Sequence, residues 1–394
     1  MIPVAEALER TLALAGPVEV EEVPLAEAFG RVLAEPAVAR LTQPPFDTAS
    51  MDGYALQRAD ADRPLRVVGE AAAGRPWDGR LRPGEALRIF TGAPVPRGAD
   101  WVVMQENTSR DGDLLRINDP GTHSNIRLKG NDFAEGSTVK PGRRLSAADL
   151  GLLAAMNLAR VRVARRPMVA ILPGGDELVP PGSDPAPGQI VSSNDLAITG
   201  LVTEAGALPR ILPIARDDEA SLRASLEAAA GADLIVTIGG ASVGDHDLIG
   251  GVTAAMGMER AFYKVAVRPG KPLVAGRLGR AAMLGLPGNP VSSIICGMIF
   301  MQPLLRRMMG LAEDPPLLRA RLGVALGPEG PRRHYLRARL EPGDDLPVVT
   351  PHPDQDSARL RLLADSEALL VRPPGDPARA AGEIVDILPM RRPG

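Results

Sequence analysis

The stretch from Asp233 to Asp247, DLIVTIGGASVGDHD, combines residue types that could bind phosphate and a metal ion. Its first half, up to Ile238, is an apolar run rich in β-branched side chains, which is typical of a strand buried in a parallel sheet. Small residues suited to a turn follow: Gly239, Gly240, Ser242 and Gly244. The bare N–H groups of such a turn commonly bind phosphate. Because Asp245 and Asp247 would repel phosphate unless a divalent cation lay between them, we predict a combined phosphate and metal site.

Other strands predicted between residues 167 and 310 end in similar loops. One is followed by Gly174, Gly175, Asp176 and Glu177, another by Asp217, and a third by Pro287, Gly288, Asn289 and Pro290. Parallel strands place their carboxyl ends at one edge of the sheet, so we expect these loops to lie side by side. Between two further strands, Arg268, Gly270 and Lys271 place positive charge beside glycine, as an anion clamp requires.

Together these residues favour phosphoryl or nucleotidyl chemistry in which Mg²⁺ acts as a clamp and Lewis acid. No candidate nucleophile is placed beside a base. The four histidines, at positions 123, 246, 334 and 352, lack the spacing of a zinc site. His246 lies between two acids, although a surface histidine is more common than a catalytic one. Each glycine turn alone is weak evidence, and their occurrence together with acids carries the prediction.

The composition of the chain excludes several classes of partner. It has 394 residues, of which 3% are aromatic, and a net charge of −3. Nucleic-acid binding needs aromatic platforms or a basic surface, so we expect no nucleic-acid partner. The single cysteine, Cys296, excludes an internal disulfide framework, and we expect it to be packed and inert. No run of about 18 apolar residues is present, so we expect a soluble, cytoplasmic protein without a membrane segment.

The order of elements predicts a multidomain α/β protein. Residues 167–310 alternate strands and helices, as in a doubly wound, mostly parallel sheet. Short strands between Gly and Pro turns predict a small β-rich insert domain at 41–132 and a β-barrel-like C-terminal domain at 311–394. Helical signals flank the insert, among them Ser146 as an N-cap with Asp149 three residues on. Residues 1–40 and 133–166 are therefore grouped as one interrupted first domain, and Asn289 before Pro290 predicts another helix start.

Seven motifs in register along the chain resemble the molybdopterin molybdenumtransferase family, the MoeA type. They are PPFDTASMDGYA, RIFTGAPVP, SNIRLKGND, GDEL, GGASVGDHD, RPGKP and GLPGNPVS. The resemblance implies the last step of molybdenum cofactor synthesis, in which adenylylated molybdopterin and molybdate give the cofactor and AMP with Mg²⁺ required. It also implies an elongated homodimer whose active site lies between the third domain of one chain and the first two of the other. Molybdopterin adenylyltransferase and molybdoenzyme chaperones are implied as further partners.

The resemblance also implies roles for single residues. Matching motifs place six of them at or beside the active site: Asp52, Thr91, Asp132, Glu177, Asp217 and Asp247. Three of these, Asp247, Asp217 and Glu177, are assigned to the metal, and Asp52 is expected to act from the partner subunit. The pterin and its phosphate are assigned to Gly239, Gly240, Ser242 and Gly244, the anions to Arg268 and Lys271, and the turn facing the ligand to Pro287, Gly288, Asn289 and Pro290.

The chain departs from the family pattern at three places. The family usually has lysine in place of Arg268 and Ser-Thr-Gly in place of Pro173-Gly174-Gly175. In the tail, Gln355-Asp356-Ser357 replaces a glycine-bearing signature. An arginine keeps the positive charge but changes its geometry, and the loss of two hydroxyl groups removes phosphate donors.

Two alternative functions are weighed against this one. A molybdopterin adenylyltransferase shares the doubly wound domain and a GGxSxG-type turn, but it needs only one domain. A non-catalytic scaffold could use the same fold to bind peptides or to dimerise, but it has no need for clustered carboxylates.

Overall fold

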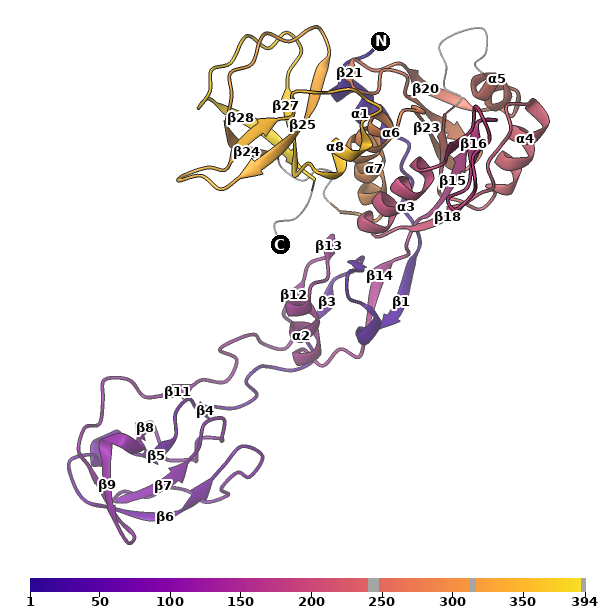
Figure 1. Cartoon of the computed structure of the whole chain (residues 1–394). Helices are drawn as coiled ribbons and strands as arrows, with labels where there is room; N and C mark the ends of the chain where they lie inside the picture. Colours follow the sequence, from indigo (N-terminus) through magenta and orange to yellow (C-terminus); the bar gives the residue numbers. More distant parts are fainter. Residues whose placement is uncertain (240–247, 312–316, 391–394) are drawn as a thin grey trace.

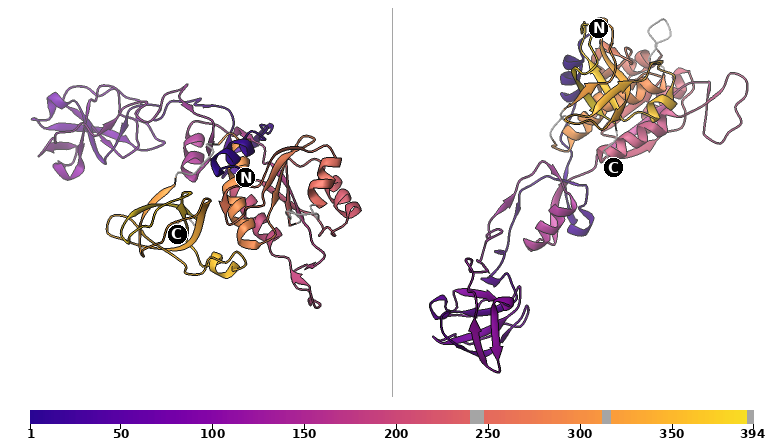
Figure 2. Two further views of the ribbon diagram at one scale, coloured as in Figure 1. Left: turned by 90° about the horizontal axis from the view of Figure 1, so that it is seen from above. Right: turned by 60° about the vertical axis from the view of Figure 1, so that its left-hand side comes forward.

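The computed structural model describes residues 1–239, 248–311 and 317–390. The molecule is elongated: the β-rich insert lies at one end, and the central α/β domain and the C-terminal barrel lie together at the other (Figure 1). A narrow linking part joins the two ends, as the other views also show (Figure 2). Within the described residues, no helix is long and apolar enough to cross a membrane.

A six-stranded sheet forms the centre of the α/β domain, with strand order β18-β15-β19-β23-β22-β20. The first four strands are parallel, and β22 is antiparallel to both of its neighbours, so the sheet is mostly parallel as predicted. The chain passes from β15 to the edge strand β18 and then returns to β19 on the other side of β15. The bounds are β15 Met168–Pro173, β18 Leu208–Ile211, β19 Leu234–Ile238, β20 Glu259–Tyr263, β22 Val274–Leu278 and β23 Ala281–Leu286.

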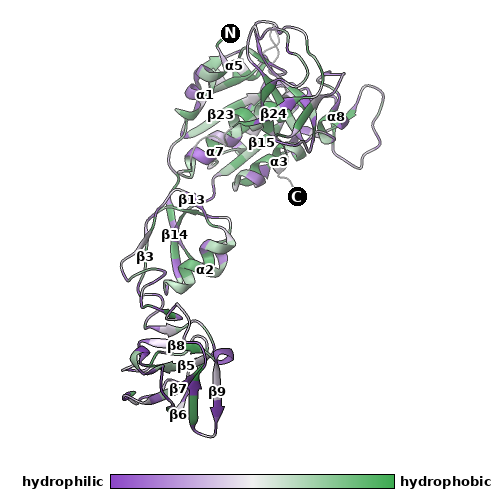
Figure 3. Ribbon diagram, turned by 90° about the vertical axis from the view of Figure 1, so that its left-hand side faces the viewer, coloured by the Kyte–Doolittle hydropathy of each residue, from purple (hydrophilic) through white to green (hydrophobic). Residues whose placement is uncertain are grey.

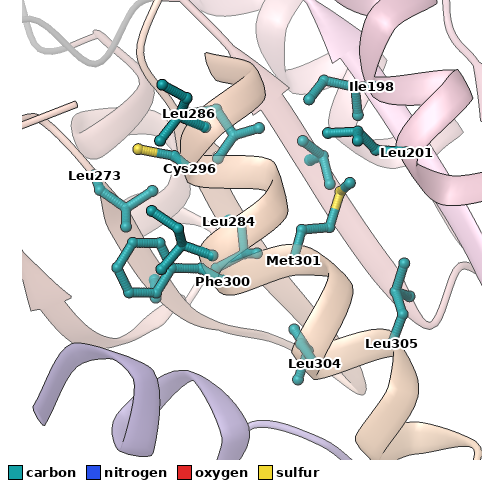
Figure 4. Close-up of a cluster of buried hydrophobic side chains, with 14 of the residues drawn as sticks. Ile198, Leu201, Leu273, Leu284, Leu286, Cys296, Phe300, Met301, Leu304 and Leu305 are labelled. Atoms are coloured by element: carbon teal, nitrogen blue, oxygen red, sulfur yellow. The ribbon is translucent and has the colours of Figure 1, made fainter. Parts of the chain in front are cut away.

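Helices cover both faces of this sheet, because successive side chains of a strand point to opposite faces. Val169 and Ile171 of β15 pack in the core that contains α3, α6 and α7, whereas Ala170 and Leu172 pack against α4 and α5. Figure 3 shows how hydrophobic the strands β15 and β23 are, and Figure 4 shows Phe300 among the side chains of the first core. The bounds are α3 Asn194–Ala205, α4 Glu219–Ala228, α5 Leu248–Ala255, α6 Pro290–Cys296 and α7 Gln302–Met308; a π-helical turn, Gly297–Met301, joins α6 to α7.

Helix α1 (Val4–Leu12) packs on the central domain, although the sequence grouped residues 1–40 with the first domain. Its Val4 and Ala7 are buried in the same core as Phe262 of β20 and Leu305 of α7. An amphipathic helix stabilises the fold by burying its apolar stripe, and the central sheet offers the apolar surface here. The linking part therefore begins after α1.

The linking part consists of a small antiparallel sheet and helix α2 (Ala147–Ala155). Its strands have the order β1-β14-β2-β13, with the bounds Val20–Pro24, Arg160–Ala164, Val32–Leu33 and Arg143–Arg144. The predicted capping box is present: Ser146 N–H donates to Asp149 Oδ2 at 2.8 Å, and Asp149 N–H donates to Ser146 Oγ at 3.3 Å. Arg165, directly after β14, pairs with Glu19 at 2.6 Å and with Asp233 at 2.8 Å, which ties the linking part to the start of β19.

The insert and the C-terminal domain are both built from strands. The insert sheet has the order β8-β5-β7-β6-β10-β9, with the bounds Trp101–Met104, Gly53–Leu56, Glu85–Ile89, Leu65–Ala71, Leu114–Ile117 and Thr108–Asp111. Two short pairs connect it to the linking part: β4 (Thr48–Ala49) with β11 (Ile126–Arg127), and β3 (Ala37–Val38) with β12 (Thr138–Val139).

The C-terminal strands close into a barrel, as the sequence indicated. Their order is β25-β26-β24-β28-β27, and β27 also pairs with β25, which closes the ring. The bounds are β24 Leu318–Leu322, β25 Arg333–Glu341, β26 Val348–Pro351, β27 Ala368–Arg372 and β28 Ile384–Pro389, with helix α8 at Leu360–Ala364. A short strand of the central domain, β21 (Val267–Arg268), pairs in parallel with the start of β25 and holds the two domains together.

Candidate active site at the carboxyl ends of the central strands

A cavity of about 1590 Å³ lies at the carboxyl ends of the central strands. The loops after β15, β18, β19 and β23 form much of its wall, together with the turn at residues 269–272 and the first residues of α3. The C-terminal domain adds Arg332, Ser357 and Ala358. Ligands of doubly wound sheets bind at this edge, beside the point where the strand order reverses.

The cavity brings together many residues that the sequence singled out. Those that line it are Gly174, Gly175, Glu177, Asp217, Gly239, Gly270, Lys271, Pro287, Gly288, Asn289 and Pro290. Arg268 does not line it, although the three residues that follow Arg268 do. Asp52, Thr91 and Asp132 lie in or beside the insert, away from the cavity of their own chain (Figure 1). Gly240, Ser242, Gly244 and Asp247 lie outside the described residues.

Glycines allow the loops to approach one another closely. Gly239 has φ +86°, and a Cβ atom at this position would lie 2.8 Å from the carbonyl oxygen of Gly174. A Cβ at Gly288 would lie 3.6 Å from the Cα of Gly239. Gly239 therefore lies close to the backbone of the loops on both sides, and a side chain at Gly239 would push the wall apart.

Carboxylates stand on two neighbouring loops of the cavity. Glu177 follows β15 and Asp217 follows β18, and the N–H of Asp217 donates to Asp176 Oδ1 at 3.2 Å, joining the loops. The described residues contain no cluster of three acidic, histidine or cysteine side chains that could hold a metal by itself. Mg²⁺ needs no such cluster, because it usually takes one or two carboxylates, keeps several waters and binds substrate phosphates. Glu177 and Asp217 offer two carboxylates of this kind at the cavity wall.

The turn after β21 carries positive charge to the cavity. Gly270 has φ +107°, and a Cβ atom there would lie 2.3 Å from the sulfur of Cys296. Only glycine fits, and Lys271 is thereby presented at the cavity wall. Cys296 is buried in α6, and burial raises the pKa of its thiol to about 12. The thiol is packed, as the sequence indicated, and it shapes the turn rather than reacting.

Asn289 and Ser357 join the central domain to the C-terminal domain at the cavity wall. The Nδ2 of Asn289 donates to Ser357 Oγ at 3.1 Å, and the N–H of Val291 donates to the carbonyl oxygen of Ser357 at 3.2 Å. Asn289 occupies the N-cap position of α6 with Pro290 next, as predicted, but its side chain makes no capping hydrogen bond. It bridges two domains instead.

A buried arginine that the sequence analysis did not single out holds the loop of Ser357. Arg337 of β25 is 1% exposed, and its guanidinium donates to Gln355 Oε1, Asp354 O, Asp356 O and Arg359 O. Burial lowers the pKa of Arg337. The sequence signal was a charged residue inside the strand pattern HYLRARL, where an apolar residue is usual.

Asn194, in the first turn of α3, was also missed. Its Nδ2 donates to the carbonyl oxygen of Gly288 at 2.7 Å and so supports the turn after β23. Its Oδ1 is buried and has no partner among the described residues, and Asn194 lines the cavity. A buried acceptor without a partner is costly, so this oxygen is suited to accept a hydrogen bond from a ligand. The available signal was SSND at a predicted helix start.

The residues predicted in the insert do not line the cavity. Asp52 and Thr91 are hydrogen-bonded neighbours. Arg88 lies nearby, stacked over Phe90 with its guanidinium carbon 4.6 Å from the ring centroid. Asp132 is exposed where the chain leaves the insert, and its N–H donates to the carbonyl oxygen of Gln43 at 3.1 Å.

Family models match the chain in three successive regions. They are the MoeA N-terminal region (domain I and II) at residues 2–157, a probable molybdopterin binding domain at 170–307, and the MoeA C-terminal region (domain IV) at 319–390. A molybdopterin molybdenumtransferase of Nostoc sp. is 37% identical over an alignment of 388 positions that covers 94% of this chain and 88% of that protein. The chain belongs to the MoeA family of molybdopterin molybdenumtransferases.

Other relatives in the MoeA family agree in sequence and in structure. Molybdopterin molybdenumtransferase 2 of Mycobacterium tuberculosis is 38% identical over 381 residues, covering 91% of this chain and 92% of that protein. A crystal structure of the molybdopterin biosynthesis MoeA protein of Pyrococcus horikoshii matches with a TM-score of 0.84 and 32% identity over 100% of both chains. A second crystal structure of a molybdopterin biosynthesis MoeA protein, from Pyrococcus horikoshii OT3, matches with a TM-score of 0.86 and 28% identity over 98% of this chain and 99% of its own.

The cavity spans two of the regions that the MoeA family models match. Its strand-end loops fall in the probable molybdopterin binding domain, whereas Arg332, Ser357 and Ala358 fall in the C-terminal region. The insert, with Asp52 and Thr91, and the linking part up to residue 157 fall in the N-terminal region.

Proposed function

We propose that this protein transfers molybdenum from molybdate to adenylylated molybdopterin, with release of AMP and a requirement for Mg²⁺. Family membership places the chain among the transferases of molybdenum cofactor biosynthesis. The observation that carries the finer proposal is the cavity at the strand ends, where Glu177, Asp217, Gly239, Lys271 and the turn of Asn289 lie together. These residue types suit a phosphate, a divalent cation and a second anion.

The chemical problem of this reaction is to bring two anions together. Lys271 and Arg332 line the cavity and lower the electrostatic cost of placing molybdate beside the diphosphate. The bare N–H groups of the strand-end turns are suited to bind phosphate oxygens. Asn194 Oδ1 is suited to orient an N–H or O–H group of the pterin. The protein thus acts by binding and orienting its substrates.

We assign Mg²⁺ to Glu177 and Asp217, together with Asp247, which lies outside the described residues. When bound, Mg²⁺ supplies positive charge shared among phosphate oxygens and acts as a Lewis acid. The carboxylates keep the ion at the strand ends, and the hydrogen bond between Asp217 and Asp176 keeps their loops in register.

The proposal includes a homodimer with shared active sites, because Asp52, Thr91 and Asp132 lie away from the cavity of their own chain (Figure 1). A symmetric pair of elongated chains can place the insert of one against the cavity of the other. We place the protein in the cytoplasm, with molybdopterin adenylyltransferase and molybdoenzyme chaperones as its partners.

Incubation of the pure protein with adenylylated molybdopterin, Mg²⁺ and molybdate tests the proposal. We expect AMP release that depends on molybdate. ATP-dependent adenylylation of molybdopterin would instead indicate an adenylyltransferase, and the absence of both reactions would indicate a scaffold. Asp217→Asn should lower the rate by about 100-fold. Asp218→Asn is the matched control, because Asp218 caps α4 by accepting from the N–H of Ser221 at 2.7 Å and asparagine caps equally well.

A further inference from the structure

A buried group of charged side chains lies in the barrel just behind the cavity turn. His334, near the start of β25, is 4% exposed, and its Nδ1 lies 3.0 Å from Glu329 Oε1. Glu329 is itself only 12% exposed and lies 3.9 Å from the guanidinium of Arg372, which is 1% exposed. Burying a charged group is costly unless partners offset the cost. None of these three side chains lines the cavity, and the reaction proposed above does not use them.

This group is connected to the cavity through the strand pair β21 and β25. In the parallel register of that pair, Arg268 stands opposite His334. The Nη1 of Arg332 donates to the carbonyl oxygen of Val267 at 3.5 Å, and Arg332 also lines the cavity. The residues directly after Arg268 form the turn that presents Lys271. A change of charge at His334 therefore changes the electrostatic potential at both the turn and Arg332.

The charged groups that face His334 come from each element packed against it. Arg268 belongs to β21, and Glu329 and Arg332 belong to the segment before β25. Arg372 of β27 stands opposite His334 in the barrel ladder, and it is paired with Asp376. Three arginines thus surround one carboxylate and one imidazole, with Asp376 already bound to Arg372 and Arg379.

The imidazole is neutral near pH 7. Burial is the main cause that lowers the pKa of His334 from its ordinary value of 6.5, and Arg268 and Arg332 lower it further, whereas Glu329 opposes them. An anion bound beside Arg268 and Arg332 would offset their positive charge, and proton uptake by His334 would then be more favourable. By linkage, proton uptake would then strengthen the binding of that anion by the same factor.

We propose that Glu329 and His334 are positioning residues that couple proton uptake by His334 to oxyanion binding where Arg332 and the turn at 269–272 meet the cavity. The proposal rests on the anion-binding role that the proposed function gives to this turn. Its consequence is that the enzyme binds its anionic substrates more tightly as the pH falls through the pKa of His334. Glu329 keeps the proton-accepting ring in place between the arginines.

The first test measures the pKa of His334 by NMR of the imidazole groups, which is practical because the chain has four histidines. His334→Gln assigns the signal. Removing the charge of Arg268 in Arg268→Gln should raise the pKa of His334 by about half a unit or more. Arg361→Gln is the control, because the side chain of Arg361 is 95% exposed on α8, and it should leave the pKa unchanged. An unchanged pKa in Arg268→Gln would overturn the coupling.

The second test adds sulfate, an oxyanion whose charge is constant between pH 5 and 8. We expect sulfate to raise the pKa of His334 by about half a unit, so that sulfate binds up to about threefold more tightly at a pH well below the pKa of His334 than at pH 7.5. In His334→Gln, whose amide can still donate to Glu329, the affinity should not change with pH. A pKa that sulfate does not move, or an equal pH dependence in the variant, would overturn the proposal.

The transferase assay at pH 7.5 distinguishes a failure of the proton coupling from a failure of the proposed function. A protein that releases AMP in response to molybdate but shows no sulfate effect would refute the proton coupling alone. A protein that shows the sulfate effect without AMP release would support the coupling and contradict the proposed reaction.

Discussion

Thr91 donates two hydrogen bonds to one oxygen of Asp52, through its backbone N–H and its hydroxyl group, each at 2.8 Å. The bond from the N–H is the main cause that lowers the pKa of Asp52, followed by the bond from the hydroxyl group. Asp52 therefore keeps its negative charge at lower pH than an ordinary aspartate. Thr91, which is 39 positions from Asp52 in the sequence, thus holds the exposed Asp52 carboxylate in one orientation.

Thr91→Val should raise the pKa of Asp52 part of the way toward its ordinary value of 3.8, because valine keeps the N–H but not the hydroxyl group. A lowered pKa stabilises the folded state above the unfolded-state pKa, and this contribution is lost as the pH falls through the lowered value. The variant should therefore resist acid less well. NMR titration of the Asp52 carboxyl carbon measures the shift, and Thr108→Val, which removes another exposed hydroxyl of the insert, should leave it unchanged.

Arg337→Met should lower the free energy of unfolding by about 2–4 kcal/mol, because it removes a buried guanidinium that donates to several partly buried carbonyl oxygens of the loop at 354–359. It should also raise the KM for the pterin substrate, since that loop carries Ser357 to the cavity. Calorimetry and steady-state kinetics measure the two effects. Arg339→Met, on the same strand but exposed, should change stability by less than about 0.5 kcal/mol. Equal effects of the two substitutions would refute the role given to Arg337.

Gly270→Ala should destabilise the protein by about 2 kcal/mol or more, because the new Cβ would meet the sulfur of Cys296 at 2.3 Å and φ is +107°. Adding Cys296→Ala removes the clash but not the backbone strain, so the double variant should recover part of the loss. A double-mutant cycle from denaturant unfolding separates the two contributions. Strictly additive effects would show that the sulfur does not shape this turn.

Local patterns in the sequence predicted local structure well. The capping box of Ser146 and Asp149 and the helix start at Asn289 and Pro290 are both present, because each depends on residues within one turn of helix. The meeting of the strand-end loops was also predictable, since parallel strands end at one edge of a sheet.

Contacts between distant segments were not predictable in this way. The side chain of Asn289 bonds to Ser357 rather than capping its helix, and Arg337 binds a loop about 20 residues away. Such contacts depend on how the barrel docks on the central domain, and local sequence patterns do not predict that docking. The same holds for α1, whose apolar stripe carries no information about which sheet it will cover.

Mixing two inactive variants tests whether the active site is shared between subunits. Asp52→Ala alters the insert and Asp217→Asn alters the cavity, which lie in different parts of one chain. If each site combines the cavity of one chain with the insert of the other, a hybrid dimer has one site with both defects and one intact site. Half of randomly mixed dimers are hybrids, so about a quarter of the normal activity should return.

The two chains need separate affinity tags, so that hybrid dimers can be isolated after refolding or co-expression. As the control, each variant mixed with itself should stay inactive. A doubly substituted chain paired with the normal chain should give hybrids without activity, because one shared site then lacks Asp217 and the other lacks Asp52. Hybrids of this pair that keep about half of the activity would indicate that each site lies within one chain. Isolated hybrids of the two single variants that show no activity would mean that Asp52 does not act across the subunit boundary. The exposed carboxylate held by Thr91 would then serve a purpose within its own chain.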